Sequence, residues 1–256
     1  KFGPLLTIKI ENMREQHTAK VIEGTVAPKD REIREPEKKY GFVAVAAGEG
    51  LHAVFSDLGC DEIVQGGQTM NPSTEDILRA VDRTPAEVVY VFPNNKNIIM
   101  AAQQAAILCE NTKVVIIPTK NIPQGISALL VFDGEAEEDE NTEVMQQAIG
   151  GVRAGQVTYA ARNSEFDGKK IKEGEYLALC EGRLTANSKR PHDVLKKLVR
   201  ELVHPDSTFA TIIYGEGVSE EEAVKLEEMF LRENHDLEIT VINGGQPVYY
   251  YILSVE

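Results

Sequence analysis

The sequence predicts an α/β protein of two related lobes: the first a doubly wound, mostly parallel sheet, the second a mixed sheet with an antiparallel hairpin. Strand, Gly-Glu-Gly, helix, strand and Gly-Gly-Gln occur in this order twice, from Phe42 to Gln68 and from Thr211 to Gln246. Continuous apolar runs at 88–92 and 114–117 are typical of strands buried on both faces of a parallel sheet. Chance among 20 glycines is the alternative explanation of the repeat. Two βαβ units are favoured over it.

Residues 1–38 are predicted to be the end of a preceding domain followed by a linker. The chain begins at Lys1 and enters an alternating strand at once, so we expect a fragment of a longer protein. The mixed charges that follow, between Pro28 and Pro36, bury too little apolar surface to order themselves.

The first lobe is predicted over residues 39–150, where strand and helix patterns alternate. We expect strands at 41–47, 61–65, 87–92 and 113–117, and helices at 50–58, 73–82, 97–110 and 123–131. Asn71 or Ser73 is expected to cap the second of these helices, with Pro72 in its first turn. The acidic run 133–140 is expected to be the solvated start of a further helix.

The second lobe is predicted over residues 151–256. Hairpin strands are expected at 157–160, 176–179 and 182–184, followed by helix 191–203, strand 208–214, helix 219–234 and strands 237–242 and 248–255. Strict alternation along the last strand would place Tyr249 and Tyr251 on one face and Tyr250 on the other.

Composition narrows the possible partners. The chain has 256 residues and a formal net charge of −14, which argues against binding nucleic acid or an anionic membrane surface. It has no apolar stretch long enough for a membrane span and no signal sequence, so we expect no membrane insertion and a cytoplasmic location. The three cysteines are far apart, and no metal-binding motif is present.

Polar residues follow the strands of the first lobe. In a parallel sheet these loops meet at one edge, where open α/β sheets bind their ligands. Each loop could merely cap its helix, but the loops supply more polar side chains than capping needs. We therefore predict a recognition surface made by Gln68, Thr69, Asn71, Asn94, Asn95, Lys96, Asn97, Thr119, Lys120 and Gln124.

No complete catalytic motif is present. The sequence lacks the phosphate-binding loop, the nucleophile elbow and the zinc-protease motif. The spacing of Gly48, Gly50 and Ala53 matches a dinucleotide fingerprint, but Glu49 would repel a pyrophosphate. Of the five histidines, only His52 lies next to the predicted edge.

Several motifs together resemble one family. They are Gly41–Gly50, Gly66–Thr74, Pro93–Asn97, Pro118–Gly125 and Gly244–Tyr251. The segment Lys9–His17, near the start of the chain, is a further part of the resemblance. In combination they resemble the C-terminal part of the bacterial fatty acid kinase A subunit, which is dihydroxyacetone-kinase-like. The resemblance covers nearly the whole chain.

The resemblance implies a two-component kinase whose acyl phosphate product is used in phospholipid synthesis. ATP and Mg²⁺ would be held by an N-terminal domain absent from this sequence, so no cofactor and no catalytic residue are expected here. The implied partner is a separate fatty-acid-binding, DegV-like protein whose bound acyl chain is phosphorylated and which would set the acyl selectivity. The resemblance also adds Gln246 and Tyr249 to the residues expected to bind the partner. It is compatible with a homodimer of the parent protein.

The kinship to dihydroxyacetone kinase gives a second hypothesis. In this hypothesis the chain is a substrate-binding domain that holds a small carbonyl compound through His52. It predicts binding of dihydroxyacetone, whereas the first hypothesis predicts that the chain docks to the acyl-carrying partner.

Overall fold

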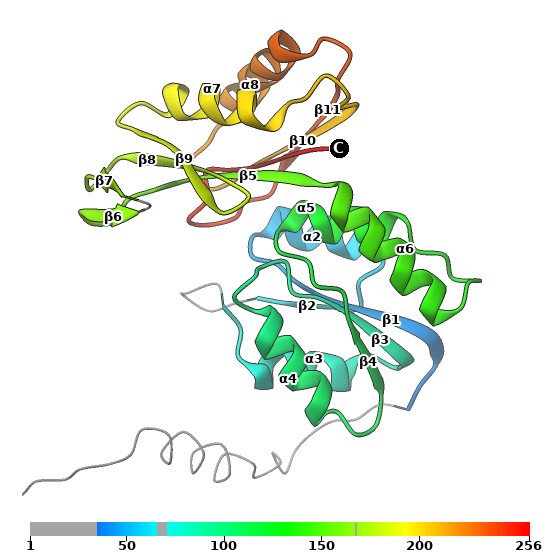
Figure 1. The fold of residues 1–256 in the computed structure, drawn as a ribbon. Helices are drawn as coiled ribbons and strands as arrows, with labels where there is room; N and C mark the ends of the chain where they lie inside the picture. Colours follow the sequence, from blue (N-terminus) through cyan, green and yellow to red (C-terminus); the bar gives the residue numbers. More distant parts are fainter. Residues whose placement is uncertain (1–34, 66–70, 167) are drawn as a thin grey trace, which may run out of the picture. The chain divides into compact units, whose positions relative to one another are not determined.

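The computed structural model describes residues 35–65, 71–166 and 168–256 (Figure 1). All of them belong to one compact unit, Ile33–Glu256. The strand predicted at the start of the chain, most of the predicted linker, and the predicted site residues Gln68 and Thr69 lie outside the described residues.

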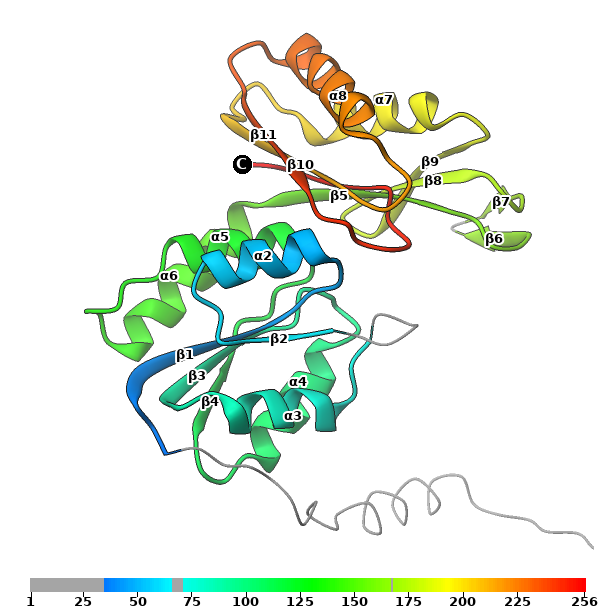
Figure 2. The same ribbon diagram turned by 180° about the vertical axis from the view of Figure 1, so that it is seen from behind.

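The first lobe is built on a parallel sheet of four strands in the order β2-β1-β3-β4. These strands are β1 (Lys38–Val45), β2 (Glu62–Val64), β3 (Ala86–Phe92) and β4 (Lys113–Ile116). The helices that follow them are α2 (Glu49–Asp57), α3 (Thr74–Arg83), α4 (Ile99–Leu108), α5 (Ile122–Leu130) and α6 (Glu138–Gly151). Helices α3 and α4 cover one face of the sheet, and α2, α5 and α6 lie on the other (Figures 1 and 2).

Alternation along β1 explains why both faces of this sheet are covered. Val43 and Val45 belong to the apolar cluster formed with α3 and α4. Phe42 and Ala44 point the other way, into a cluster with α2 and α5. Because successive side chains of a strand point to opposite faces, an uninterrupted apolar run requires helices on both sides.

The second lobe is built on a mixed sheet of six strands in the order β11-β10-β12-β5-β8-β9. In this sheet β10 and β11 pair in parallel, and the other neighbours are antiparallel. The strands are β5 (Arg153–Tyr159), β8 (Tyr176–Cys180), β9 (Arg183–Ser188), β10 (Phe209–Tyr214), β11 (Glu238–Asn243) and β12 (Tyr251–Val255), with a separate small hairpin of β6 (Ser164–Phe166) and β7 (Lys169–Ile171).

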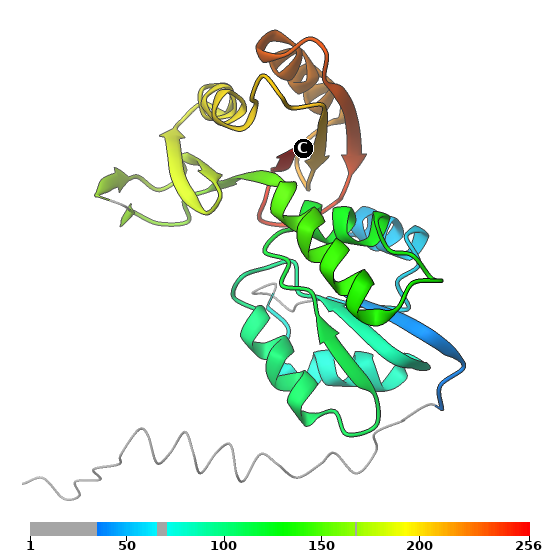
Figure 3. The same ribbon diagram turned by 45° about the vertical axis from the view of Figure 1, so that its right-hand side comes forward.

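Two helices cover one face of the second sheet. They are α7 (Pro191–Leu202) and α8 (Glu220–Glu233), whose apolar faces pack on it (Figure 3). On the opposite face Ile213 and Ile252 are buried in the cluster that contains Phe92 and Leu51 of the first lobe. The two sheets are therefore separate, but they share one apolar core.

Glycines allow the two lobes to meet backbone to backbone. The amide of Leu51, in the first turn of α2, donates to the carbonyl oxygen of Gly244 at 3.1 Å. A methyl group on Gly50 would overlap the Asn243 carbonyl, and one on Gly48, whose φ is +108°, would overlap that of Gly244. The missing side chains of Gly48 and Gly50 therefore allow the main chain at the start of α2 to approach that of Asn243 and Gly244 closely.

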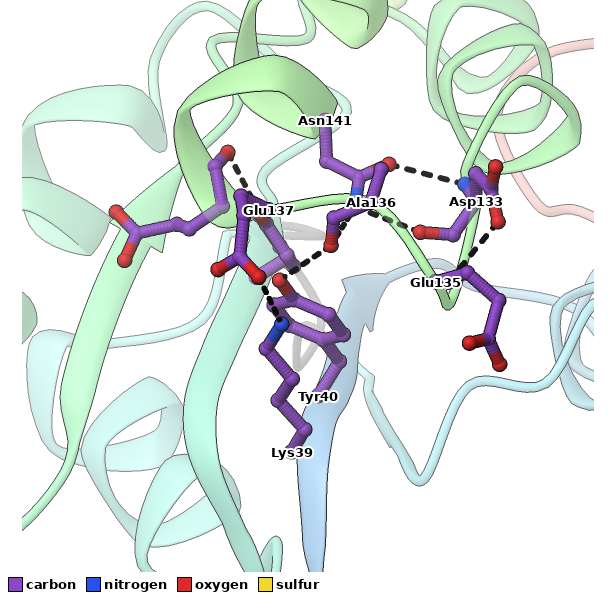
Figure 4. A network of polar contacts seen from close by, with 9 residues as sticks. Lys39, Tyr40, Asp133, Glu135, Ala136, Glu137 and Asn141 are labelled. Carbon is purple, nitrogen blue, oxygen red and sulfur yellow. Dashed lines mark hydrogen bonds and ion pairs between the residues drawn. The ribbon is translucent and has the colours of Figure 1, made fainter.

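The acidic run before α6 forms an ordered turn (Figure 4). Asn141 closes it, accepting from the Asp133 amide at 2.9 Å and donating to the Asp133 carbonyl at 2.7 Å. The Tyr40 hydroxyl donates to the Ala136 carbonyl at 2.8 Å, and Lys39 pairs with Glu137 at 3.1 Å. These contacts hold the α5–α6 turn against β1, while the carboxylates of the run stay mostly exposed.

The order of elements matches the prediction in the described residues, with shifts at their ends, except for β6 and β7 of the small hairpin, for which no strands were predicted. Two details were wrong. Pro72 precedes the Ser73 cap of α3 instead of lying in the first turn. The last strand begins at Tyr251, so strand alternation does not apply to Tyr249 and Tyr250. The chain before it is a loop, in which Val248 has a φ of +71° and the Gln246 side chain donates a hydrogen bond to the Tyr249 carbonyl.

Replacing Gly50 by Ala tests the junction of the lobes. The added methyl group has no space beside Asn243, so we expect a loss of about 1–3 kcal/mol in the free energy of unfolding. Gly150→Ala in α6 is the matched control, since no described atom lies within 4 Å of a methyl group there, and its stability should be unchanged or slightly raised. Equal stabilities of the two variants in urea unfolding would contradict the tight junction.

The capping box of α3 gives a prediction for acidic pH. Hydrogen bonds from the Ser73 hydroxyl and backbone amide hold the pKa of the Asp76 carboxyl below its usual range. A lowered folded-state pKa contributes stability that is present above the ordinary pKa of about 3.9 and is lost as pH falls through the folded value. Ser73→Ala should cost about 1 kcal/mol at neutral pH.

Asp76→Asn should therefore destabilise the protein at neutral pH, and the difference from the unmodified chain should shrink below about pH 4. Chemical unfolding across this pH range measures the difference. Asp57→Asn, an exposed position on α2, is the control. A difference that stays constant with pH would show that the Asp76 charge is not part of the cap.

Candidate functional site

A cavity of about 300 Å³ lies where the two lobes meet. Its first-lobe lining comes from the loops after β1, β3 and β4, at residues 45–47, 93–98 and 120–122. The loops at 93–98 and 120–122 carry residues of the predicted recognition surface, whereas 45–47 were predicted to end the first strand. The loop after β2 is only partly described. The second lobe closes the cavity with residues such as Gln156, Leu179 and Ile252.

Four of the predicted site residues are buried and bonded to nearby main chain. Thr119 accepts from the Asn94 amide at 2.9 Å, and the Asn94 side chain donates to the Val45 carbonyl at 3.0 Å. Gln124 accepts from the Lys120 amide at 2.7 Å and donates to the Ile149 carbonyl at 3.0 Å. The fourth, Gln246, belongs to the second lobe. The first three fix the loops of the edge.

Gln246 holds a loop of the second lobe in place through hydrogen bonds to main chain. Only 1% of it is exposed, and its amide nitrogen donates to the carbonyls of Ile213 and Tyr249 at 3.4 and 3.2 Å. The side-chain oxygens of Asn94 and Gln246 have no hydrogen-bond partner among the described residues and lie against Gly125 and Gly244. A side chain at either glycine would displace the amide.

Another group of predicted residues remains near solvent. Lys96, Asn97 and Lys120 are exposed, and neither lysine forms a salt bridge with a described residue. Asn95 is half-buried, accepts from the Asn97 amide at 3.0 Å and donates to the exposed Asn71 at 3.4 Å. The structure thus brings Asn71 next to the loop after β3.

Tyr249 and His52 have different surroundings. Tyr249 is half-buried and lines the cavity, and desolvation raises the pKa of its phenol, so it stays protonated at neutral pH. His52 is exposed on α2, does not line the cavity, and has Ser56 beside it at 3.5 Å. The orienting partner that a histidine adduct with a small carbonyl compound would need is not among the described groups that contact it.

Sequence reasoning named Gln246 and Tyr249 of the second lobe but missed the other residues that this lobe contributes to the cavity. Phe166, Leu179, Glu181 and Gly182 line it, from the small hairpin and from the β8–β9 turn. A methyl group on Gly182 would lie 3.4 Å from the Lys96 Nζ, so Lys96 reaches across to this turn. No local pattern marks these residues, because the hairpin turn comes to the cavity only through packing of the two sheets.

The chemistry of the cavity comes from cations, amides and apolar groups. Among the described residues, no group of three or more His, Cys, Asp or Glu side chains is placed to hold a metal ion. In the same part of the chain, no helix has both the length and the apolar character needed to cross a membrane. What the cavity offers chemically is two ammonium groups, the carboxylate of Glu181, several amides and an apolar wall.

A family match identifies the class of protein to which the chain belongs. The family of C-terminal regions of proteins like the fatty acid kinase A subunit matches residues 41–256, and the chain belongs to this family. The match agrees with the resemblance found in the sequence motifs. Nothing in it bears on the kinship to dihydroxyacetone kinase.

Curated relatives match over the whole chain. Protein YloV of Bacillus subtilis is 44% identical over 255 residues, and an uncharacterized protein of Staphylococcus haemolyticus is 37% identical over 257 residues. In both cases all of this chain is covered but only 46% of the relative. The chain therefore spans less than half the length of these relatives.

Solved structures share the fold at low sequence identity. A DegV family protein of Corynebacterium glutamicum, Cg2579, is similar with a TM-score of 0.61 and 15% identity, covering 85% of this chain and 96% of that one. The Fak B3 protein of Streptococcus pneumoniae, whose structure holds linoleic acid, has a TM-score of 0.57 and 11% identity, covering 85% and 99%. At these identities the likeness shows a shared α/β fold and nothing about ligands.

Proposed function

We propose that this chain is the C-terminal docking domain of a fatty acid kinase. It binds a separate DegV-like fatty-acid-binding protein, so that the acyl chain held there can be phosphorylated with ATP and Mg²⁺ bound in another part of the kinase. The observation that carries the proposal is the family match over residues 41–256. The span of less than half of the relatives leaves room for a nucleotide-binding part elsewhere.

The rim of the cavity supports docking at this edge. Lys96 and Lys120 are exposed cations in a chain of net charge −14, so they suit acidic groups on a partner or on its cargo. Electrostatic complementarity of this kind raises association rates and fixes orientation. Phe166, 43% exposed, and the half-buried Tyr249 also line the cavity and provide the aromatic surface that interface centres favour.

The buried amides have an indirect role in this proposal. Thr119, Gln124 and Gln246 hold the loops in place, and the exposed Asn71, Lys96, Asn97 and Lys120 would make the contacts, with Asn95 between the two groups. A cytoplasmic location and dimerisation of the parent protein belong to the same proposal. No contact described above favours the alternative of dihydroxyacetone binding at His52.

Reversing the two lysine charges tests the docking edge. The double variant Lys96→Glu, Lys120→Glu should bind the purified fatty-acid-binding protein at least about tenfold more weakly, because two attractive contacts become repulsive. Isothermal titration calorimetry measures the affinity, and thermal unfolding checks that the fold is intact.

The control carries the same charge change at exposed lysines of α7 and α8, as Lys196→Glu, Lys225→Glu. Its affinity should fall much less. If both double variants bind as tightly as the unmodified chain, the interface is not at this edge.

The chain alone should not catalyse phosphoryl transfer. Mixed with ATP, Mg²⁺ and a partner loaded with fatty acid, it should form no acyl phosphate, because the proposed nucleotide-binding part is absent from this sequence. Mass spectrometry of the acyl product, with a full-length relative as positive control, measures this. Turnover by the isolated chain would place the active site within these residues.

A further inference from the structure

The cavity lies at the point where open α/β sheets bind small molecules. In the order β2-β1-β3-β4 the chain proceeds from β1 to one side and then returns to the other, so the order reverses between β1 and β3. Ligands of such sheets bind at the carboxyl ends of the strands on either side of this reversal. The loops after both strands, including Ala46, Ala47 and Pro93 to Ile98, line the cavity.

One part of the lining is apolar and continuous. Leu51 of α2, Ile122 of α5 and Ile252 of β12 line the cavity and belong to one hydrophobic cluster. Three different elements, from both lobes, therefore supply a single apolar wall. These side chains are only 1%, 8% and 3% exposed, and a ligand with a short hydrocarbon portion would cover the small part of the wall that still faces the cavity.

The charged part of the lining is positive. Lys96 and Lys120 line the cavity and form no salt bridge with a described residue. Among the described residues of the lining, the carboxylate is that of Glu181, which accepts from the Ala154 amide at 2.6 Å, within its own lobe. The described part of the cavity therefore has two ammonium groups against one carboxylate, and this excess of positive charge suits the carboxylate or phosphate of a ligand.

The size of the cavity limits the ligand. About 300 Å³ lies at the lower end of the range of small-molecule sites, roughly 300–1,000 Å³. Because Lys96 reaches Gly182 across the junction, a bound anion would contact a side chain that already spans the two lobes.

We infer that this cavity binds a small organic anion, with its carboxylate or phosphate at Lys96 and Lys120 and a short aliphatic portion on the wall of Leu51, Ile122 and Ile252. The inference goes beyond the proposed docking role and does not depend on it, since the ligand binds the chain without a partner. The shared chemistry is one anionic group joined to a short hydrocarbon.

The test uses the whole chain alone and three matched probes: hexanoate, hexyl phosphate and the uncharged hexanol. Binding is followed by calorimetry and by amide chemical shifts at constant ionic strength. At least one of the two anions should bind more tightly than hexanol and shift the amides of residues 93–98 and 120–122. Comparison of the anions separates a carboxylate site from a phosphate site.

Charge-neutral variants locate the site. Lys96→Gln and Lys120→Gln should each weaken anion binding by about tenfold, the effect of losing one charge-assisted contact. Lys225→Gln, an exposed lysine of α8, should leave it unchanged. Acetate and inorganic phosphate should bind more weakly than the six-carbon probes, because they leave the apolar wall exposed.

Three outcomes would overturn the inference. They are no binding of either anion at millimolar concentration, hexanol binding as tightly as both anions, or equal binding by the Lys96, Lys120 and Lys225 variants. The partner is absent from all of these measurements, so failure here would leave the docking proposal to its own test.

Discussion

One backbone contact sets the relation between the two sheets. The amides in the first turn of a helix lack acceptors within the helix, and no described side chain caps α2. The carbonyl of Gly244, from the other lobe, accepts from Leu51 instead and places a negative dipole at the positive end of α2. This geometry requires the absence of side chains at Gly48 and Gly50. The cavity borders this contact, since Leu51 and Gln246 both line the cavity. The dimensions of the cavity therefore depend on how closely Gly48 and Gly50 approach the main chain at Gly244.

The polar residues of the strand tips divide into two groups by burial. Buried amides and hydroxyls, such as Thr119, Gln124 and Gln246, satisfy main-chain groups that would otherwise be unpaired in the interior. They stabilise the loops in one conformation, although the side-chain oxygen of Gln246 has no hydrogen-bond partner among the described residues. The exposed lysines, by contrast, have no salt-bridge partner among the described residues, so the docking proposed at this edge would depend mainly on charge.

Family membership and fold likeness carry different information. The match to the C-terminal region of fatty acid kinase A proteins assigns the chain to a kinase family. The likeness to DegV family proteins, at 15% identity or less for the two structures compared, establishes only the arrangement of strands and helices. If the proposed partner is itself DegV-like, the proposed kinase would contain two proteins of one fold. In the present chain this fold encloses a small cavity lined by two lysines. The function then resides in the lining of the site and not in the fold.

Local patterns in the sequence determined the order and type of the elements, because helix and strand periods and the apolar runs of β3 and β4 are properties of neighbouring residues. They also grouped the polar loop residues of the first lobe at one edge of its sheet. Only the tertiary structure decided that Gly244 meets Leu51, that Phe166 and Gly182 reach the cavity, and that Asn94 and Gln124 are buried while Lys96 and Lys120 are exposed. Burial at a loop depends on what packs against it from far along the chain, and no local period encodes that partner.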